Sequence, residues 1–431
     1  MREDWIECKF GDIITFKNGY AFKSTGYLKS GIPVIRIGDI KENEVLIENA
    51  ICVDENKDLK EYEIVKDDIL IAMSGATTGK FGRYNLNDKA YLNQRVGNIK
   101  PISDKYIYKS FLYYLLSQLK REIEKSAYGR AQPNISSKKI EELTIAFAPL
   151  PEQRAIVKKL ESLFSSLDTG VTDLKKAQQQ LKIYRQAVLK KAFEGEKREQ
   201  KLINISDALG GFAFKSPDFL EKGIYQVIRI GNIRPDLIRL DSNPIFVNEL
   251  NDKTRKYLLK DNDIVISLTG TRNKRDYGFS ALVKNENLLL NQRLAAIRFN
   301  QDCNPKYYLH YFSTDYFKDD FFSAETGNTG QGNVGMNAIK ETLVPFPSLL
   351  VQNEIVKQIE SRLSVCDSIE QNIKESLLKA EALRQSILKK AFEGNLLTAQ
   401  ELEECKMAND YEPASVLLER IKKTKNSSFL V

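Results

Sequence analysis

The sequence predicts a mixed α and β protein, in which two α/β domains are joined by two long antiparallel coiled-coil helices as an internal repeat with a pseudo-two-fold axis. Three observations support this class. Sequence blocks occur twice in the same order, each copy begins with short apolar runs, and each copy ends in a long segment with a seven-residue apolar period. We expect domains at 1–150 and 196–349, long helices at 151–195 and 350–395, and a tail at 396–431.

The internal repeat spans most of the 431 residues. The distance between matching blocks grows from 192 residues (211 minus 19) to 199 residues (388 minus 189), which indicates small insertions in the second copy. The segments between the blocks differ, so one scaffold with two sets of loops would recognise two different targets. The matching pairs are 19–24 with 211–216, 34–38 with 227–231, 93–95 with 291–293, and 189–195 with 388–394.

Each copy opens with an α/β domain. In the first copy, the apolar runs at 32–37 and 68–73 are bounded by Gly and Asp and predict strands, whereas 108–116 has the pattern of a helix. The matching runs of the second copy are 225–230, 264–268 and 307–312.

Each copy closes with a helical segment, at about 152–194 and 351–393. Pro151 stands in a first turn, where proline is tolerated, and Gly195 and Gly394 are natural C-terminal caps. About 42 residues at roughly 1.5 Å each make a helix of about 63 Å. We expect the two apolar seams to bury each other; the alternative is that each helix packs only on its own domain. The expected seam residues are Leu160, Leu167, Leu174, Leu181 and Val188, with Ile156, Leu163, Ala177 and Tyr184 at the complementary position, and Ile359, Cys366, Ile373, Ala380 and Ile387 in the second copy.

The composition fits a soluble protein and is compatible with a phosphate-rich partner. Hydrophobic residues make up 42% of the chain, charged residues 29%, and the net charge is +7. Five scattered cysteines without a CxxC pair indicate reduced thiols in the cytoplasm, and the single histidine, His310, argues against His-based metal or catalytic sites. An acidic N-terminus and the lack of a long apolar run argue against a signal peptide and a membrane span. We expect no metal and no cofactor.

Three stretches in each copy combine flexible backbone with hydrogen-bond donors that suit phosphates and base edges. They are 22–24, 74–83 and 128–134 in the first copy, matched by 214–216, 269–278 and 326–333 in the second. The second stretch is expected to be a surface loop in both copies, because it follows a strand-like run. The alternative for any one of them is an ordinary solvated turn. The candidate DNA contacts are Lys23, Ser24, Thr77, Thr78, Lys80, Arg83, Arg95, Arg130 and Gln132 in the first copy, and Lys215, Ser216, Thr271, Arg272, Asn273, Lys274, Arg275, Arg293, Asn328 and Gln331 in the second.

The triplets Asn93-Gln94-Arg95 and Asn291-Gln292-Arg293 are identical in both copies. Arg pairs with guanine and Asn or Gln with adenine, which favours DNA contact. Two different targets should not need the same triplet, which favours a role in the scaffold or in phosphate positioning. Both interpretations remain open from the sequence.

Motifs for catalysis are incomplete. Residues 74–81 lack the spacing and the hydroxyl of a Walker loop, and 243–246 lacks the second proline of an adenine-methyltransferase tetrad. No glycine-rich turn between a strand and a helix suggests a site for S-adenosylmethionine. We therefore expect no catalytic residues.

Taken together, the repeat resembles the specificity (S) subunit of Type I restriction-modification systems over about residues 5–425. The most specific matches are the junction 149–153, the block 190–195, the two triplets and the tail 412–420. The resemblance implies two target recognition domains, each reading one half of a bipartite DNA target with an unread spacer. It implies that the helices set the spacer and dock two modification subunits, which methylate adenine with S-adenosylmethionine and are joined by ATP-driven restriction subunits. The chain itself would not be an enzyme.

One departure concerns the second junction, where Gln352 matches Gln153 but Val351 replaces Glu152. This departure leaves open whether the two docking surfaces that the resemblance implies are equivalent. The tail, considered alone, predicts a short exposed amphipathic helix; the resemblance implies that it completes a conserved region. The competing functions are recognition in another bipartite (Type IIB-like) system, a self-sufficient methyltransferase or nuclease, and a coiled-coil scaffold without nucleic-acid function.

Overall fold

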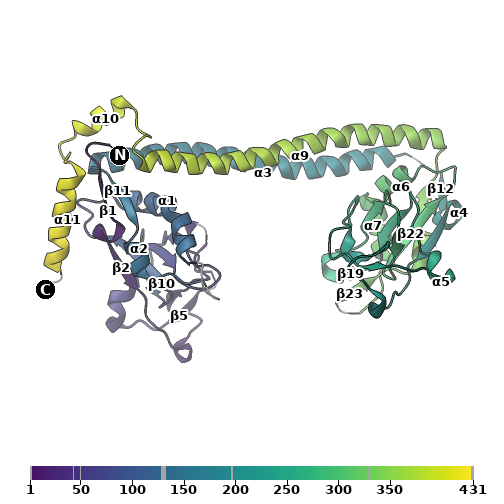
Figure 1. Cartoon of the computed structure of the whole chain (residues 1–431), viewed down its shortest axis with the longest axis horizontal. Helices are drawn as coiled ribbons and strands as arrows, with labels where there is room; N and C mark the ends of the chain where they lie inside the picture. The colour runs from purple at the N-terminus through teal and green to yellow at the C-terminus, as the bar shows by residue number, and fades with distance from the viewer. Residues whose placement is uncertain are drawn as a thin grey trace. The chain divides into compact units, whose positions relative to one another are not determined.

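The computed structural model describes residues 2–41, 43–48, 50–127, 133–195, 198–328 and 330–428. It divides into two compact units, Met1–Asp173 with Ser376–Val431, and Leu174–Glu375. Each unit combines one α/β domain with one segment of each long helix (Figure 1). The division therefore runs through both helices and not at their ends.

The first unit is built on two main sheets. The five-stranded sheet has the order β2-β10-β7-β8-β4, and the four-stranded sheet has the order β5-β3-β9-β6. Strand β7 (Ile69–Ala72) is buried on both faces, because Ile69 and Ile71 enter one core cluster whereas Leu70 and Ala72 enter another. The remaining strands are β2 (Ile14–Asn18), β3 (Ile32–Ile35), β4 (Asn43–Glu44), β5 (Ile51–Val53), β6 (Glu63–Ile64), β8 (Phe81–Arg83), β9 (Ala90–Leu92) and β10 (Val96–Pro101), with β1 (Ile6–Lys9) paired to β11 (Thr144–Phe147).

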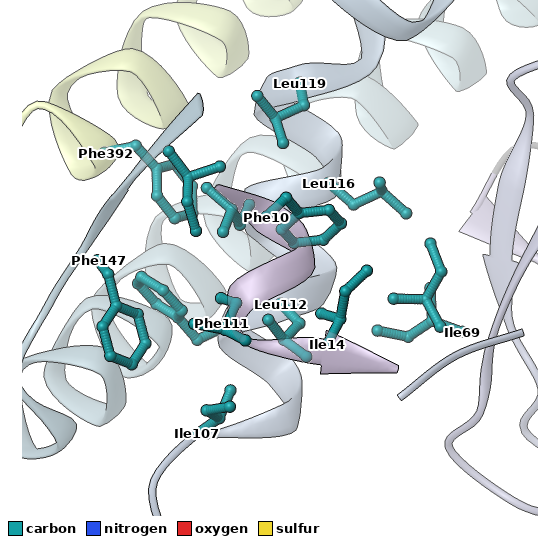
Figure 2. Close-up of a cluster of buried hydrophobic side chains, with 14 of the residues drawn as sticks. Phe10, Ile14, Ile69, Ile107, Phe111, Leu112, Leu116, Leu119, Phe147 and Phe392 are labelled. Atoms are coloured by element: carbon teal, nitrogen blue, oxygen red, sulfur yellow. The ribbon is translucent and has the colours of Figure 1, made fainter. Parts of the chain in front are cut away.

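Helix α1 (Lys109–Ala127) contributes a row of buried apolar side chains to the first hydrophobic core. Leu112, Leu116 and Leu119 recur at helical spacing and face Phe10 and other side chains of the cluster in Figure 2. A phenylalanine from the end of the second long helix also enters this core. The rings of Phe111 and Phe392 lie 5.3 Å apart.

The second unit repeats the topology of the first. Its four-stranded sheet has the order β13-β22-β18-β20, which matches β2-β10-β7-β8, and β14 pairs parallel to β21 as β3 pairs to β9. The strands and helices predicted in both copies are confirmed, with starts that agree within two residues, although α1 continues well beyond 116. The elements are β12 (Glu199–Lys201), α4 (Leu202–Ile205), β13 (Ser206–Gly210), β14 (Tyr225–Ile228), β15 (Ile233–Arg234), β16 (Leu237–Ile238), β17 (Phe246–Val247), α5 (Asp252–Arg255), β18 (Ile264–Ser267), β20 (Ser280–Leu282), β21 (Leu288–Leu290), β22 (Leu294–Phe299), α6 (Pro305–Phe312), α7 (Asp315–Ser323), α8 (Met336–Glu341) and β24 (Leu343–Pro345).

The long helices are α3 (Leu150–Phe193) and α9 (Leu349–Phe392), each of 44 residues. In the first unit the start of α3 packs on the end of α9, and in the second unit the end of α3 packs on the start of α9, so the paired segments are antiparallel (Figure 1). Arg384 lies over the Phe164 ring at 4.4 Å, and Arg185 forms an ion pair with Glu370 at 3.1 Å. The alternative, in which each helix packs only on its own domain, is excluded.

One part of the predicted seam is out of register. Leu160, Leu181 and Val188 are buried as expected, but Leu163 and Tyr184 at the expected complementary position are exposed. The complementary position is one residue later, at Phe164 and its heptad equivalents, which include Val171 and Arg185. The reason is that Arg185 reaches two carboxylates of α9, a partner that an apolar pattern does not reveal.

The C-terminal tail forms two helices, α10 (Ala399–Lys406) and α11 (Ala414–Ser428), and both belong to the first unit. Leu417 and Ile421 are buried in the same core as Phe10. The Asp4 carbonyl accepts a hydrogen bond from the Ala414 amide at 3.0 Å. The tail is therefore part of the domain and not an exposed helix.

In the part of the chain that the structure describes, no helix has the length and apolar character to cross a membrane. All five cysteines are free thiols. Among the same residues, no group of three or more His, Cys, Asp or Glu side chains is placed to hold a metal ion.

Candidate nucleic-acid interface

The residues just before the first candidate stretch lie directly against the repeated triplet in both units. Tyr20 forms a parallel β-bridge with Asn93, and Phe212 forms the equivalent parallel β-bridge with Asn291. A Cβ on Gly19 would collide with the carbonyl of Asn93, so this close approach requires glycine, and Gly211 meets Asn291 in the same way. The two strongest sequence repeats are thus one structural feature.

The asparagine of the triplet belongs to the scaffold. The Asn93 amide donates to the Ile35 carbonyl at 3.1 Å, and the Met73 amide donates to the Arg95 carbonyl at 2.9 Å. The second unit repeats both contacts, with Asn291 donating to Ile228 at 3.2 Å and Leu268 donating to Arg293 at 3.0 Å. The triplet backbone therefore ties neighbouring strands together, while the side chains of the glutamines and arginines remain exposed at positions 94, 95, 292 and 293.

The lysine and the serine of the first stretch are accessible in both units. Lys23 precedes a short 3-10 helix, η2 (Ser24–Gly26), and Lys215 precedes its counterpart η4 (Ser216–Asp218). Both lysines and both serines are exposed.

In the first unit, the second stretch is a compact turn that contacts the end of the third. The Gly75 amide donates to the Pro133 carbonyl at 3.1 Å. Thr78 is 8% exposed, and its hydroxyl donates to Gly75 and Pro133 at 2.7 and 3.1 Å, so we assign it to the turn and withdraw it as a DNA contact. The Thr77 hydroxyl donates to the Ile37 carbonyl at 3.1 Å, and Lys80 is half-buried.

Arg83 faces helix α1 and not the turn. It lies in strand β8, its guanidinium is 4.7 Å from the centre of the Tyr113 ring, and Nη2 is 3.4 Å from the Ser110 hydroxyl. Two further predicted contacts, Arg130 and Gln132, lie outside the described residues.

In the second unit, the stretch predicted as a loop contains a strand. Strand β19 (Thr269–Thr271) pairs antiparallel with β23 (Gln331–Asn333), which joins the second and third stretches into a two-stranded ribbon. The prediction of a loop was therefore wrong for these residues, because the pairing partner is far along the chain. The 3-10 helix η6 (Arg272–Lys274) forms the tip. Asn273, Lys274 and Asn328 are exposed.

The ribbon tip is held by side-chain contacts. The Glu325 carboxylate accepts hydrogen bonds from Tyr277 and from Arg272, which lower its pKa. Burial, followed by the contact with Glu325, raises the pKa of the Tyr277 hydroxyl. Arg275 adopts a left-handed backbone with φ 46° and lies 4.8 Å from the centre of the Phe322 ring.

Beside the ribbon is an open concavity of about 700 Å³. It brings together the predicted residues Thr271, Arg293 and Gln331, and it adds Arg234, which sequence reasoning missed. The sequence could have indicated Arg234, because the first copy also has a basic residue, Lys41, at the matching position (234 minus 193). The concavity therefore joins four separate stretches of the chain with donors that suit DNA.

The glutamines at the two helix junctions make equivalent hydrogen bonds. Gln153 accepts from the Tyr108 amide at 2.9 Å and donates to the Ala148 carbonyl at 2.8 Å. Gln352 accepts from the Asn304 amide at 2.7 Å and donates to the Pro347 carbonyl at 2.9 Å. These buried side chains fix where each long helix leaves its domain.

Comparisons with known proteins agree with this architecture. The chain is 25% identical to the Type I restriction enzyme EcoBI specificity subunit of Escherichia coli, with 99% of this chain and 94% of the relative covered. It is 27% identical to the EcoKI specificity subunit of Escherichia coli (strain K12), with 99% and 97% covered.

Solved structures show the same fold. A chain from a structure of the assembly and conformational transition of the type I R-M system matches with a TM-score of 0.74, 17% identity, and coverage of 92% of this chain and 99% of that one. The HsdS subunit from Thermoanaerobacter tengcongensis matches with a TM-score of 0.55, 16% identity, and coverage of 91% and 98%. The family described as the Type I restriction modification DNA specificity domain matches residues 2–179 and 196–379. The chain belongs to this family and carries two copies of its domain.

Proposed function

We propose that the chain reads a bipartite DNA target, one half-site with each α/β domain, and directs adenine methylation and restriction by partner subunits. The observation that carries this proposal is the contrast between the two copies. They share the glycine and triplet scaffold, yet among the described residues the second stretch is a compact turn with one antiparallel bridge, from Ser74 to Asn134, in one copy and part of a two-stranded ribbon in the other. One scaffold with two different contact elements suits two different sequences.

Within each domain the candidate contacts fall into two groups. The exposed lysines at 23 and 215 suit phosphates, because a flexible ammonium needs no fixed geometry. Thr271, Gln331 and Arg293 border the concavity and suit base edges, since hydroxyl, amide and guanidinium groups match base donors and acceptors. In the first domain Arg95 takes the place of Arg293, because both end the repeated triplet.

In this proposal, other chains catalyse the methylation and the cleavage of DNA. The relatives named above are specificity subunits of restriction enzymes, which supports a recognition subunit that works with modification and restriction subunits. We propose two modification subunits, one for each copy of the junction and long helix, together with ATP-dependent restriction subunits. We propose that the modification and restriction subunits assemble with this chain on DNA in the cytoplasm.

The long helices are the proposed determinant of the unread spacer. Half-sites on one face of a duplex lie roughly 34–36 Å apart for one helical turn. Helices α3 and α9 are each 44 residues long and pack antiparallel within each unit. Such helices suit a fixed number of base pairs between the two half-sites.

The direct test is reconstitution with the modification subunits and S-adenosylmethionine on a library of random duplexes, followed by sequencing of methylated adenines. We expect a motif of two defined halves separated by an undefined spacer, and no methyl transfer by the chain alone. One continuous motif, no sequence preference, or methylation by the isolated chain would each overturn the proposal.

A further inference from the structure

The tip of the ribbon formed by β19 and β23 holds one arginine in a fixed orientation. The Nε of Arg272 donates to Glu325 at 2.9 Å, and Nη1 lies 3.5 Å from the Gly327 carbonyl. The second oxygen of Glu325 accepts from the hydroxyl of Tyr277, a residue that is 2% exposed. The Arg272 side chain remains 42% exposed, whereas that of Glu325 is 11% exposed. A largely buried network thus holds a side chain that reaches solvent.

Two glycines make room for this network. A Cβ on Gly332 would collide with the Glu325 carboxylate, and a Cβ on Gly270 would lie 2.7 Å from the Asp276 carboxylate. Asp276 accepts hydrogen bonds from the amide and the hydroxyl of Thr271 at 2.6 and 3.1 Å. The backbone just before the arginine is therefore fixed as well, which limits the orientations that its guanidinium can take.

The pairing with Glu325 favours a base contact over a phosphate contact. A phosphate is attracted by positive charge, which a neighbouring carboxylate offsets. A guanine instead needs two donors in one plane, and a guanidinium held through Nε can present its terminal nitrogens in that way. Holding the side chain in advance also lowers the entropy lost on binding.

In the described part of the first domain, the segment that matches the ribbon tip shows no counterpart of this network. Residues 74–80 include one lysine but no arginine, tyrosine or carboxylate. We propose that Arg272 reads a guanine in the second half-site, with Glu325 and Tyr277 as positioning residues. The inference rests on the proposed function of the chain as a reader of two half-sites, and it assigns one base to one side chain.

The test compares variants of the full chain, assembled with its modification subunits, on the random duplex library. Arg272→Lys keeps the charge and a cation beside Glu325 but removes the planar fork. We expect it to make one position of the second half-site degenerate, with discrimination against a wrong base reduced about ten- to a hundredfold. The first half-site and all other positions should be unchanged.

Glu325→Ala should relax the same position, and Glu325→Gln, which keeps an acceptor for the guanidinium, should restore most of the discrimination. Lys274→Ala is the matched control on the same tip. It should leave the motif intact and weaken binding equally on matched and mismatched duplexes, with a reduced salt dependence. An unchanged motif in Arg272→Lys would overturn the inference, and so would relaxation of the first half-site. Absence of any bipartite motif with the unaltered chain would instead refute the proposed function.

Discussion

Glu152, in the first turn of α3, accepts a hydrogen bond of 2.8 Å from the indole nitrogen of Trp5. Arg2 lies 3.5 Å from the same carboxylate oxygen. The matching residue of the second copy, Val351, is 38% exposed. Among the described residues, the N-terminal segment makes this contact with Glu152, and the contact accounts for the departure between the two junctions.

Replacing this carboxylate should destabilise the first unit. Glu152→Val leaves the Trp5 indole and the Arg2 guanidinium without their acceptor, at a cost of about 1–3 kcal/mol. Urea unfolding followed by tryptophan fluorescence measures the loss, because Trp5 is the single tryptophan of the chain. Val351→Glu, a change on an exposed surface, should shift stability by less than about 0.5 kcal/mol. Equal stability of Glu152→Val and the unaltered chain would show that the buried contact contributes nothing.

The close approach at Gly19 gives a second prediction. Gly19→Ala forces the backbone away from the triplet and should cost more than about 2 kcal/mol, as strain at a tightly packed position does. Gly26→Ala is the matched control, since nothing lies within 4 Å of its Cβ position. The same fluorescence measurement compares the two. If both variants unfold alike, the triplet is not part of a rigid scaffold.

The contact between the tail and α3 should depend on pH. A hydrogen bond from Lys159, and then bonds within the Thr398 cap, lower the pKa of Glu401 from 4.5 to about 2. Because the folded pKa is depressed, this contribution is present above about pH 4.5 and is lost as the pH falls towards 2. The protection of the α10 amides against hydrogen exchange, taken relative to the intrinsic exchange rate at each pH, should fall over that range. Glu401→Gln should exchange faster at neutral pH and show no further step, and an unchanged pH profile in this variant would contradict the assignment.

Lengthening the coiled coil tests its role in spacing. One heptad inserted after Asp173 and another after Glu375 leave the contacts within each unit intact and lengthen each helix by roughly 10 Å. We expect the unread spacer to grow by about three base pairs, at roughly 3.4 Å per pair, or the complex to lose activity. An active complex with the original spacer would mean that the helices do not set it.

Local patterns in the sequence predicted the elements well and their long-range partners poorly. The strands at Ile32 and Ile69 follow from apolar runs, which are local features of the sequence. The seam register and the ribbon at Thr269 depend on partners far along the chain, namely the α9 carboxylates near Arg185 and strand β23. Glu325 could not be recognised as a positioning residue, because nothing near it in the sequence points to Arg272.

The most direct test of the account is to exchange residues 1–150 for those of a related chain and to sequence the methylated adenines made by the reconstituted complex. The account predicts that one half of the bipartite motif changes while the other half is retained. A change in both halves would contradict it, because each domain would then not read its own half-site.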